Sequence, residues 1–185
     1  GGTISPTSRT VPPGESTTFT VTPDTGYQIG SVSGCNGTLS GTTYTNGPII
    51  SACTVSASFT TLPQYLLSVT KTGRGKITSS PTGINCGTKC KYSYMSGTSV
   101  TLTAEASSGH QFIGWSGACT NTSGTCTIPM TSDTTVTATF KPVYKLTVTK
   151  SGAENGSVIS TPAGIDCDTS CAKTTASFVK DTPVV

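Results

Sequence analysis

The fold is decided above all by one segment, Phe112-Ile-Gly-Trp-Ser-Gly-Ala-Cys-Thr-Asn-Thr-Ser-Gly-Thr-Cys-Thr-Ile128. It contains the only tryptophan, Trp115, and two cysteines, Cys119 and Cys126, that flank a polar loop. Apolar residues on both sides of such a loop are typical of a β-hairpin, and the cysteine pair predicts a disulfide that closes it.

The composition of the 185-residue chain indicates an all-β protein. Charged residues make up 10% of the sequence, against about 25% in an average soluble protein. Disorder is the first alternative for so polar a chain, but Val, Leu, Ile, Phe and Tyr recur at strand-like intervals. Threonine and valine dominate these intervals, both are β-branched strand formers, and no stretch shows a helical period.

The charge pattern and the apolar runs exclude two classes of partner. The net charge of +3 is dispersed, without the basic run that a nucleic-acid surface needs. No apolar run approaches the roughly 18 residues of a membrane span, so we expect no membrane insertion. No charged and apolar leader opens the chain, so any export signal is expected to have been removed or to lie outside this sequence. Nothing in the sequence indicates a cofactor.

Eight cysteines form four local pairs, which are Cys35 and Cys53, Cys86 and Cys90, Cys119 and Cys126, and Cys167 and Cys171. An even number in a low-charge chain predicts disulfides and an oxidising compartment, and hence an extracellular or cell-surface location. Zinc is the competing interpretation. The C-x3-C spacing does not favour it, and the single histidine, His110, has no cysteine near it in sequence.

Internal repeats organise the chain. The segment Tyr65–Gly73 returns 79 positions later as Tyr144–Gly152, and Pro81–Cys90 returns as Pro162–Cys171. A more diverged copy precedes them. Its matching segments are Gly2–Pro6 with Gly75–Pro81, Gly14–Val21 with Gly97–Ala104, Gly26–Ile29 with Gly109–Phe112, and Val55–Phe59 with Val136–Phe140.

We therefore predict tandem modules of about 80 residues. Residues 1–62 form a module that lacks its first strand, residues 63–143 form a complete module, and residues 144–185 form a module truncated in its C-terminal half. The proline-containing segments Leu62–Gln64 and Lys141–Val143 are predicted to be linkers. Incomplete modules leave an open sheet edge. Either the chain is a segment of a longer repeat protein, or incomplete modules complete one another between chains by strand addition.

The complete module should contain five or six short strands. Apolar residues alternate with polar ones at Leu67 and Val69, at Val100–Ala104 and at Val136–Phe140, which predicts a half-buried antiparallel or mixed sheet. Turns are predicted at residues 73–75 and 152–156.

In combination, these motifs resemble the divergent internalin-B B-repeat family of bacterial surface proteins. The motifs are Leu-x-Val-x-Lys-x-Gly, Pro-x-Gly-Ile-x-Cys-x-x-x-Cys, Gly-Thr-x-Val-x-Leu-x-Ala, Gly-Trp-Ser-Gly-x-Cys and Thr-Val-Thr-Ala-Thr-Phe. The run Gly34–Pro48, followed by Cys53–Phe59, is typical of a sister form. The resemblance implies secreted or surface-anchored bacterial proteins built from small, β-grasp-like modules, and it implies no enzyme activity.

The leading hypothesis is a non-catalytic extracellular structural segment, either a stalk, a fibre or a filament subunit. Its partners would be neighbouring repeats or identical chains. The alternative is an adhesin or carbohydrate-binding module that contacts surface glycans or proteins, with Trp115 as the possible ligand contact.

Two groups of residues are candidates for a catalytic or a metal site. His110 takes the place of Tyr27 in the first copy, which suits an aromatic packing residue better than a general base, and no Ser-His-Asp order can be assembled around it. Asp133, Asp166 and Asp168 could suggest calcium, but they fall short of a converging set of oxygen ligands. We predict no catalytic and no metal site.

Two further groups could lie on the surface. Asn36, Asn121 and Asn155 match the N-glycosylation sequence and mark exposed turns. The segment Tyr92–Met95 could form an exposed contact patch, although a strand face buried on the module is favoured.

Overall fold

The computed structural model describes residues 1–151 and 156–185, which cluster into two compact units, Gly1–Gln64 and Tyr65–Val185. The described residues form strands, turns and loops and contain no helix. The all-β prediction is confirmed. The turn expected at 152–156 and Asn155 lie outside the described residues, apart from Gly156.

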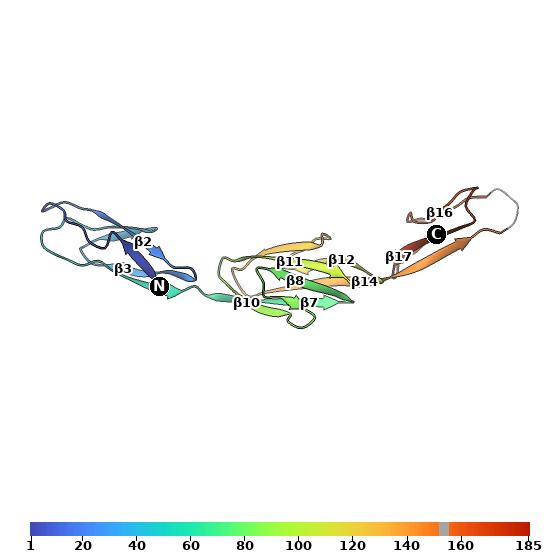
Figure 1. The fold of residues 1–185 in the computed structure, drawn as a ribbon, viewed down its shortest axis with the longest axis horizontal. Coiled ribbons are helices and arrows are strands. Elements are labelled where there is room, and N and C mark those ends of the chain that lie inside the picture. The colour runs from blue at the N-terminus through green and yellow to red at the C-terminus, as the bar shows by residue number, and fades with distance from the viewer. Residues whose placement is uncertain (152–155) are drawn as a thin grey trace. The chain divides into compact units, whose positions relative to one another are not determined.

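The two larger sheets of the second unit share one core, and Figure 1 labels most of their strands. The first sheet has the order β10-β7-β14-β12 and the second the order β13-β11-β8-β9. Their strands are β7 (Gln64–Thr72), β8 (Gly75–Ser80), β9 (Asn85–Cys86), β10 (Lys91–Met95), β11 (Ser99–Ala106), β12 (His110–Gly117), β13 (Thr125–Pro129) and β14 (Thr134–Thr149). The complete module therefore has eight strands, more than the five or six predicted, and the two-residue strand β9 accounts for one of the additional strands.

The first and last strands of the module, β7 and β14, pair in parallel at the centre of the first sheet. Leu67 lies opposite Thr134, and Val69 lies opposite Val136. β12 pairs with the other edge of β14 in the antiparallel direction. The sheet is mixed, and the buried side chains alternate along both central strands as the sequence period predicted.

Apolar side chains from both sheets fill the core between them. Leu67, Leu102 and Val136 are 0% exposed. Gly75 lies under the ring of Phe140, since a Cβ at this position would come within 2.4 Å of the ring carbons. Glycine at the start of β8 therefore allows the phenylalanine of β14 to close the core.

β14 does not end with the complete module. It continues through residues 141–143 to Thr149, and its second half pairs antiparallel with β17 (Lys173–Val179). The prediction of a linker at Lys141–Val143 is wrong. Pro142 can lie within a strand because its carbonyl still accepts a hydrogen bond, here from the Lys180 amide at 2.8 Å.

The third repeat copies the start of the complete module. β15 (Val158–Ile159) pairs with β16 (Asp166–Cys167), as β8 pairs with β9. The Ser160 hydroxyl accepts a hydrogen bond from the Ile165 amide at 2.9 Å, and Ser79 accepts one from Ile84 at the same distance. The two loops are therefore alike in hydrogen bonding as well as in sequence.

The first unit contains a four-stranded sheet, β1-β2-β5-β4, and a two-stranded sheet, β3-β6. Its strands are β1 (Gly2–Ser5), β2 (Thr18–Pro23), β3 (Tyr27–Ser33), β4 (Thr38–Ser40), β5 (Thr43–Thr45) and β6 (Ser56–Thr61). Pairing of β3 with β6 shifts register between Ile29 and Ser31, and pairing of β12 with β14 shifts at the matching place, between Phe112 and Gly114. This shared irregularity supports the alignment of the two copies.

Candidate functional site

The segment Phe112–Ile128 connects two sheets and is not a hairpin. β12 pairs with β14 in the first sheet, whereas β13 pairs with β11 in the second. The hairpin prediction is wrong because apolar residues on both sides of the loop pack into the same core from opposite sheets. The loop returns to β12 at one point, where the Trp115 amide donates to the Asn121 carbonyl at 2.7 Å. The Cys119–Cys126 disulfide thus joins one sheet to the other.

Trp115 is a core residue. Its side chain is 3% exposed, and its ring centroid lies 5.4 Å from that of Phe112, which in turn contacts Phe140. Its buried indole N–H has no hydrogen-bond partner among the described residues. Stacking on a sugar needs an exposed ring face, and this ring offers none.

The first unit closes the corresponding place differently. Cys35 follows β3 as Cys119 follows β12, but its disulfide partner, Cys53, lies in the loop before β6 and not on a strand. The sheet register puts Tyr44 where the complete module has Cys126, because Tyr44 lies opposite Phe19 as Cys126 lies opposite Leu102. The Tyr44 hydroxyl donates to the Gly34 carbonyl at 2.6 Å. The predicted Cys35–Cys53 disulfide is formed, and a tyrosine hydrogen bond stands at the position that corresponds to Cys126.

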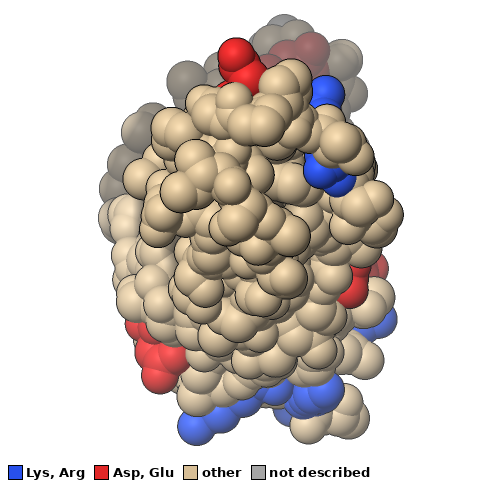
Figure 2. Space-filling model, turned by 90° about the vertical axis from the view of Figure 1, so that its left-hand side faces the viewer, with Lys and Arg blue, Asp and Glu red and all other residues tan. Residues whose placement is uncertain are grey.

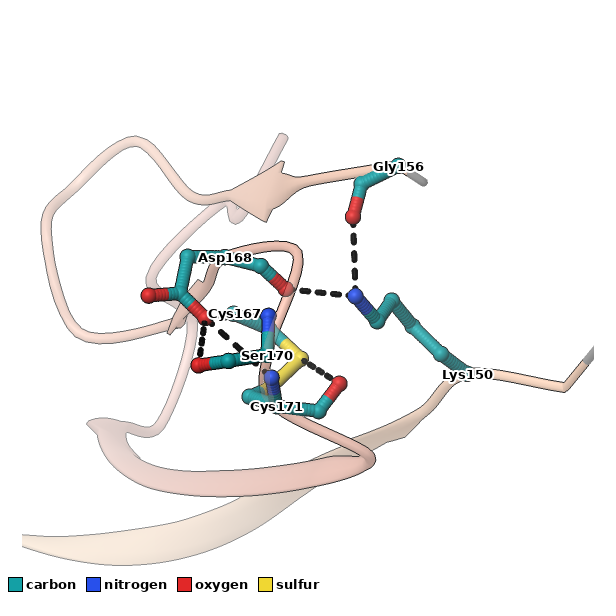
Figure 3. Close-up of a disulfide and its surroundings, with 6 residues drawn as sticks. All are labelled: Lys150, Gly156, Cys167, Asp168, Ser170 and Cys171. Carbon is teal, nitrogen blue, oxygen red and sulfur yellow. Dashed lines mark hydrogen bonds between the residues drawn. A yellow bond between two sulfur atoms is a disulfide. The ribbon is translucent and has the colours of Figure 1, made fainter. Parts of the chain in front are cut away.

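The remaining cysteine pairs, Cys86–Cys90 and Cys167–Cys171, each close a C-x3-C loop. Figure 3 shows that Lys150, at the end of β14, donates to the carbonyl groups of Gly156 and Asp168. All eight cysteines are thus in disulfides.

The Asp168 carboxylate accepts hydrogen bonds from residues of its own loop (Figure 3). It accepts hydrogen bonds from the Ser170 hydroxyl at 2.6 Å, the Ser170 amide at 2.8 Å and the Cys171 amide at 3.1 Å. These bonds, with the Ser170 hydroxyl contributing most, lower the pKa of Asp168, and the positive charge of Lys150 adds to the effect. The carboxylate acts as a cap for the turn.

The other two aspartates considered for calcium do not join Asp168. Asp133 accepts a hydrogen bond from the Leu66 amide at 2.8 Å and so holds the start of β7. Asp166 is exposed on β16. Within residues 1–151 and 156–185, no group of three His, Cys, Asp or Glu side chains could hold a metal ion.

The remaining candidates lie in ordinary packing or surface positions. The ring of His110, at the start of β12, contacts the Ser108 carbonyl at 3.4 Å. Tyr94 is 4% exposed and shares a hydrogen bond with the Ser79 hydroxyl at 2.7 Å, while Met95 is 41% exposed. Tyr92 is half-buried and contacts Tyr94 edge to face. Asn36 and Asn121 are both exposed.

Comparison with known protein families agrees with the repeat pattern. The divergent InlB B-repeat domain matches residues 1–63 and 65–144. The chain belongs to this family. No curated protein and no solved structure matches it. The B-repeat is a repeat domain and not a known enzyme family. The family suggests an extracellular repeat module of bacterial surface proteins, and the four disulfides are consistent with that location.

The sequence did not predict one concave feature of this B-repeat protein, which lies in its first unit. The first unit has a groove of about 760 Å³ between β1, β2 and the loops 6–13 and 49–55. No sequence signal marks this groove, because the alternation of apolar residues predicts which side of a strand faces inward and not how the loops cover it.

The B-repeat surface carries little charge where it is seen in Figure 2. Most of the surface that faces the viewer there is uncharged. Among the described residues no helix is long and apolar enough to span a membrane.

Proposed function

We propose that the chain is a non-catalytic structural segment of a bacterial surface or secreted protein, in which disulfide-bonded B-repeats form a stalk, fibre or filament subunit. The observation that carries the proposal is the direct succession of repeats. β14 belongs to two repeats at once, because its first half pairs with β7 and its second half with β17. A continuous strand makes a stiffer connection between repeats than a flexible linker would.

The chemistry of the described side chains supports a mechanical role. The polar groups that drew attention as catalytic or metal ligands are engaged in turns and strand ends, as with Asp133 and Asp168. Trp115 lies in the core, so we do not propose glycan binding through it. Exposed hydroxyls instead pair across strands, such as Thr70 with Thr137 at 2.6 Å and Thr101 with Thr127 at 3.0 Å.

The proposal is tested on the native protein in the cells that make it. Antibody labelling of intact cells should find it at the surface, and alkylation before reduction should leave all eight cysteines unmodified. Electron microscopy of the released material should then show fibres or stalks. Labelling only after lysis, together with free thiols, would overturn the proposal.

A further inference from the structure

The chain enters the complete module through β7 and leaves it through β14. β6 of the first unit ends at Thr61 and β7 begins at Gln64, so two residues, Leu62 and Pro63, separate these strands. At the other end, β14 passes without a break into the third repeat, where its second half pairs with β17. A pull along the chain would therefore reach the module at the start of β7 and near Lys141 of β14.

These two strands pair in parallel, and their direction decides how such a pull acts on them. Six residue pairs join the strands, from Leu67 opposite Thr134 to Thr72 opposite Thr139. The start of β7 and the end of the paired part of β14 thus lie at opposite ends of this ladder. A force that separates these two points slides one strand along the other, so the evenly spaced hydrogen bonds of the ladder share the load. If both points lay at the same end, the bonds would instead break one after another.

The ladder lies in the interior of the first sheet. β10 covers the other edge of β7, and β12 covers the other edge of β14. Core side chains close one face of the ladder, since Val69 is 3% exposed and Val136 and Ala138 are 0% exposed. On this face water cannot readily replace a strained hydrogen bond, and a hydrogen bond away from water is electrostatically stronger.

Side chains reinforce the ladder on its other face and at its first pair. The hydroxyls of Thr70 and Thr137 share a hydrogen bond of 2.6 Å between the two strands. The Asp133 carboxylate accepts a hydrogen bond from the Leu66 amide at 2.8 Å. This second bond extends the contact between the strands by one residue beyond the first pair of the ladder.

We infer that the complete module bears tension and that the parallel β7–β14 ladder is its mechanical clamp, the contact whose rupture limits unfolding under force. The inference rests on the proposed structural role, because a stalk or fibre transmits force along its chain, and it assigns that force to one ladder. Forced unfolding is governed by the unfolding rate, so the clamp sets how long the module stays folded under load. The Cys86–Cys90 and Cys119–Cys126 disulfides then limit the length of chain that rupture releases.

Optical-tweezers measurements on the full-length chain test the direction of loading. The natural cysteines are all in disulfides, so handles attach to introduced thiols. Gln64→Cys with Lys141→Cys loads opposite ends of the ladder, and Gln64→Cys with Ser132→Cys loads the same end. Gln64 and Ser132 are exposed, and the Lys141 side chain is 43% exposed. The unfolding force should be at least about twofold higher for the first pair of handles, because six residue pairs then share the load.

A matched pair of threonine variants tests the clamp with the pulling points held at residues 64 and 141. Thr70→Val removes the hydroxyl pair across the ladder. Thr101→Val removes the similar pair with Thr127, at 3.0 Å, between β11 and β13, which lie off the path of the force. At constant force Thr70→Val should raise the unfolding rate about fivefold, as expected for the loss of one hydrogen bond at the limiting contact. Thr101→Val should leave the rate close to that of the parent, because its contacts are still formed when the ladder ruptures. Urea unfolding followed by Trp115 fluorescence verifies that both variants keep a folded module.

Two results would overturn the inference. One is an unfolding force that is no higher when opposite ends of the ladder are loaded. The other is an unfolding rate under force that rises equally in Thr70→Val and Thr101→Val, or in neither. The surface role would stand in both cases, because cell labelling and thiol alkylation test it separately. A chain found only inside cells would instead overturn that role and leave the measured clamp unchanged.

Discussion

The first and second repeats place apolar residues at the same positions and bury them to different degrees. Phe140 is 2% exposed and Leu102 is 0% exposed, whereas Phe59 and Phe19 at the corresponding positions are half-buried. The sequences of these strands are alike, so the residues themselves do not account for the difference. What differs is β7, which covers the core of the second repeat. The comparison shows that the first strand of a B-repeat completes its core.

The comparison is tested most strongly by two leucines with equivalent sequence positions, Leu67 and Leu146. Leu67→Ala should destabilise the complete module by about 2–5 kcal/mol, because it leaves a cavity in a closed core. Leu146→Ala should cost less than about 1 kcal/mol, since this side chain is 40% exposed. Trp115 is the only tryptophan, so its fluorescence during urea unfolding reports on the complete module. Equal midpoints for both variants at low protein concentration would contradict the comparison.

The second test concerns how each repeat joins its sheets. Replacing both Cys119 and Cys126 by serine removes a covalent link between sheets and should cost about 2–3 kcal/mol. Tyr44→Phe removes only the hydrogen bond to the Gly34 carbonyl and should cost about 1 kcal/mol. Urea unfolding monitored by Trp115 measures the first change, and hydrogen exchange of the β2 and β5 amides measures the second. If Tyr44→Phe destabilises its repeat as much as the cysteine variant destabilises the complete module, the expected order of the two losses of stability is wrong.

The sequence predicted which residues are buried better than it predicted how strands are connected. The alternation at Leu67, Val69 and Val136 followed from a period of two, which fixes the side of the strand that faces the core. The same period carries no information about which sheet a strand joins. Phe112–Ile128 therefore looked like a hairpin, although its two strands lie in opposite sheets.

The linker at Lys141–Val143 was mispredicted for a related reason. A proline between two repeats suggests a break in the strand, because proline cannot donate to a ladder. Here its carbonyl accepts from Lys180, so the strand continues across the repeat boundary. The groove of the first unit was not predicted, because the period of two shows which side chains face inward and not how the loops 6–13 and 49–55 cover them.

A third test replaces the equivalent glycine of each repeat, Gly75 and Gly2, by alanine. A Cβ on Gly75 would lie 2.4 Å from the ring of Phe140, and a Cβ on Gly2 would lie 2.3 Å from the ring of Phe59. Gly75→Ala should cost about 1–3 kcal/mol because Phe140 is fixed in a closed core. Gly2→Ala should cost as much or more, since its Cβ would also lie 2.6 Å from the Thr22 carbonyl oxygen, and movement of the half-buried Phe59 ring does not relieve that contact. Hydrogen exchange of the adjacent strands, β8 and β1, measures both, and a negligible effect of Gly75→Ala would contradict the closed core of the second repeat.

The smallest expected effect is a difference between the two C-x3-C loops in their response to acid. Asp168 stands in the third repeat where the complete module has Gly87, so only one loop has a capping carboxylate. Hydrogen bonds from Ser170, then from Cys171, lower the pKa of Asp168. A group whose pKa is lower in the folded state stabilises that state fully above its unfolded pKa of about 4. This contribution is lost as the pH falls through the lower, folded value.

The amide signals of Ser170 and Cys171 in NMR spectra should therefore shift with a midpoint below pH 4, because their acceptor becomes protonated there. The amides of Thr88 and Lys89, in the loop without the carboxylate, should show no matching transition. Asp168→Asn should abolish the shift and leave the Cys167–Cys171 disulfide intact. A midpoint at or above the ordinary aspartate value, or a parallel transition at Thr88, would mean that the hydrogen bonds to Asp168 do not hold the loop.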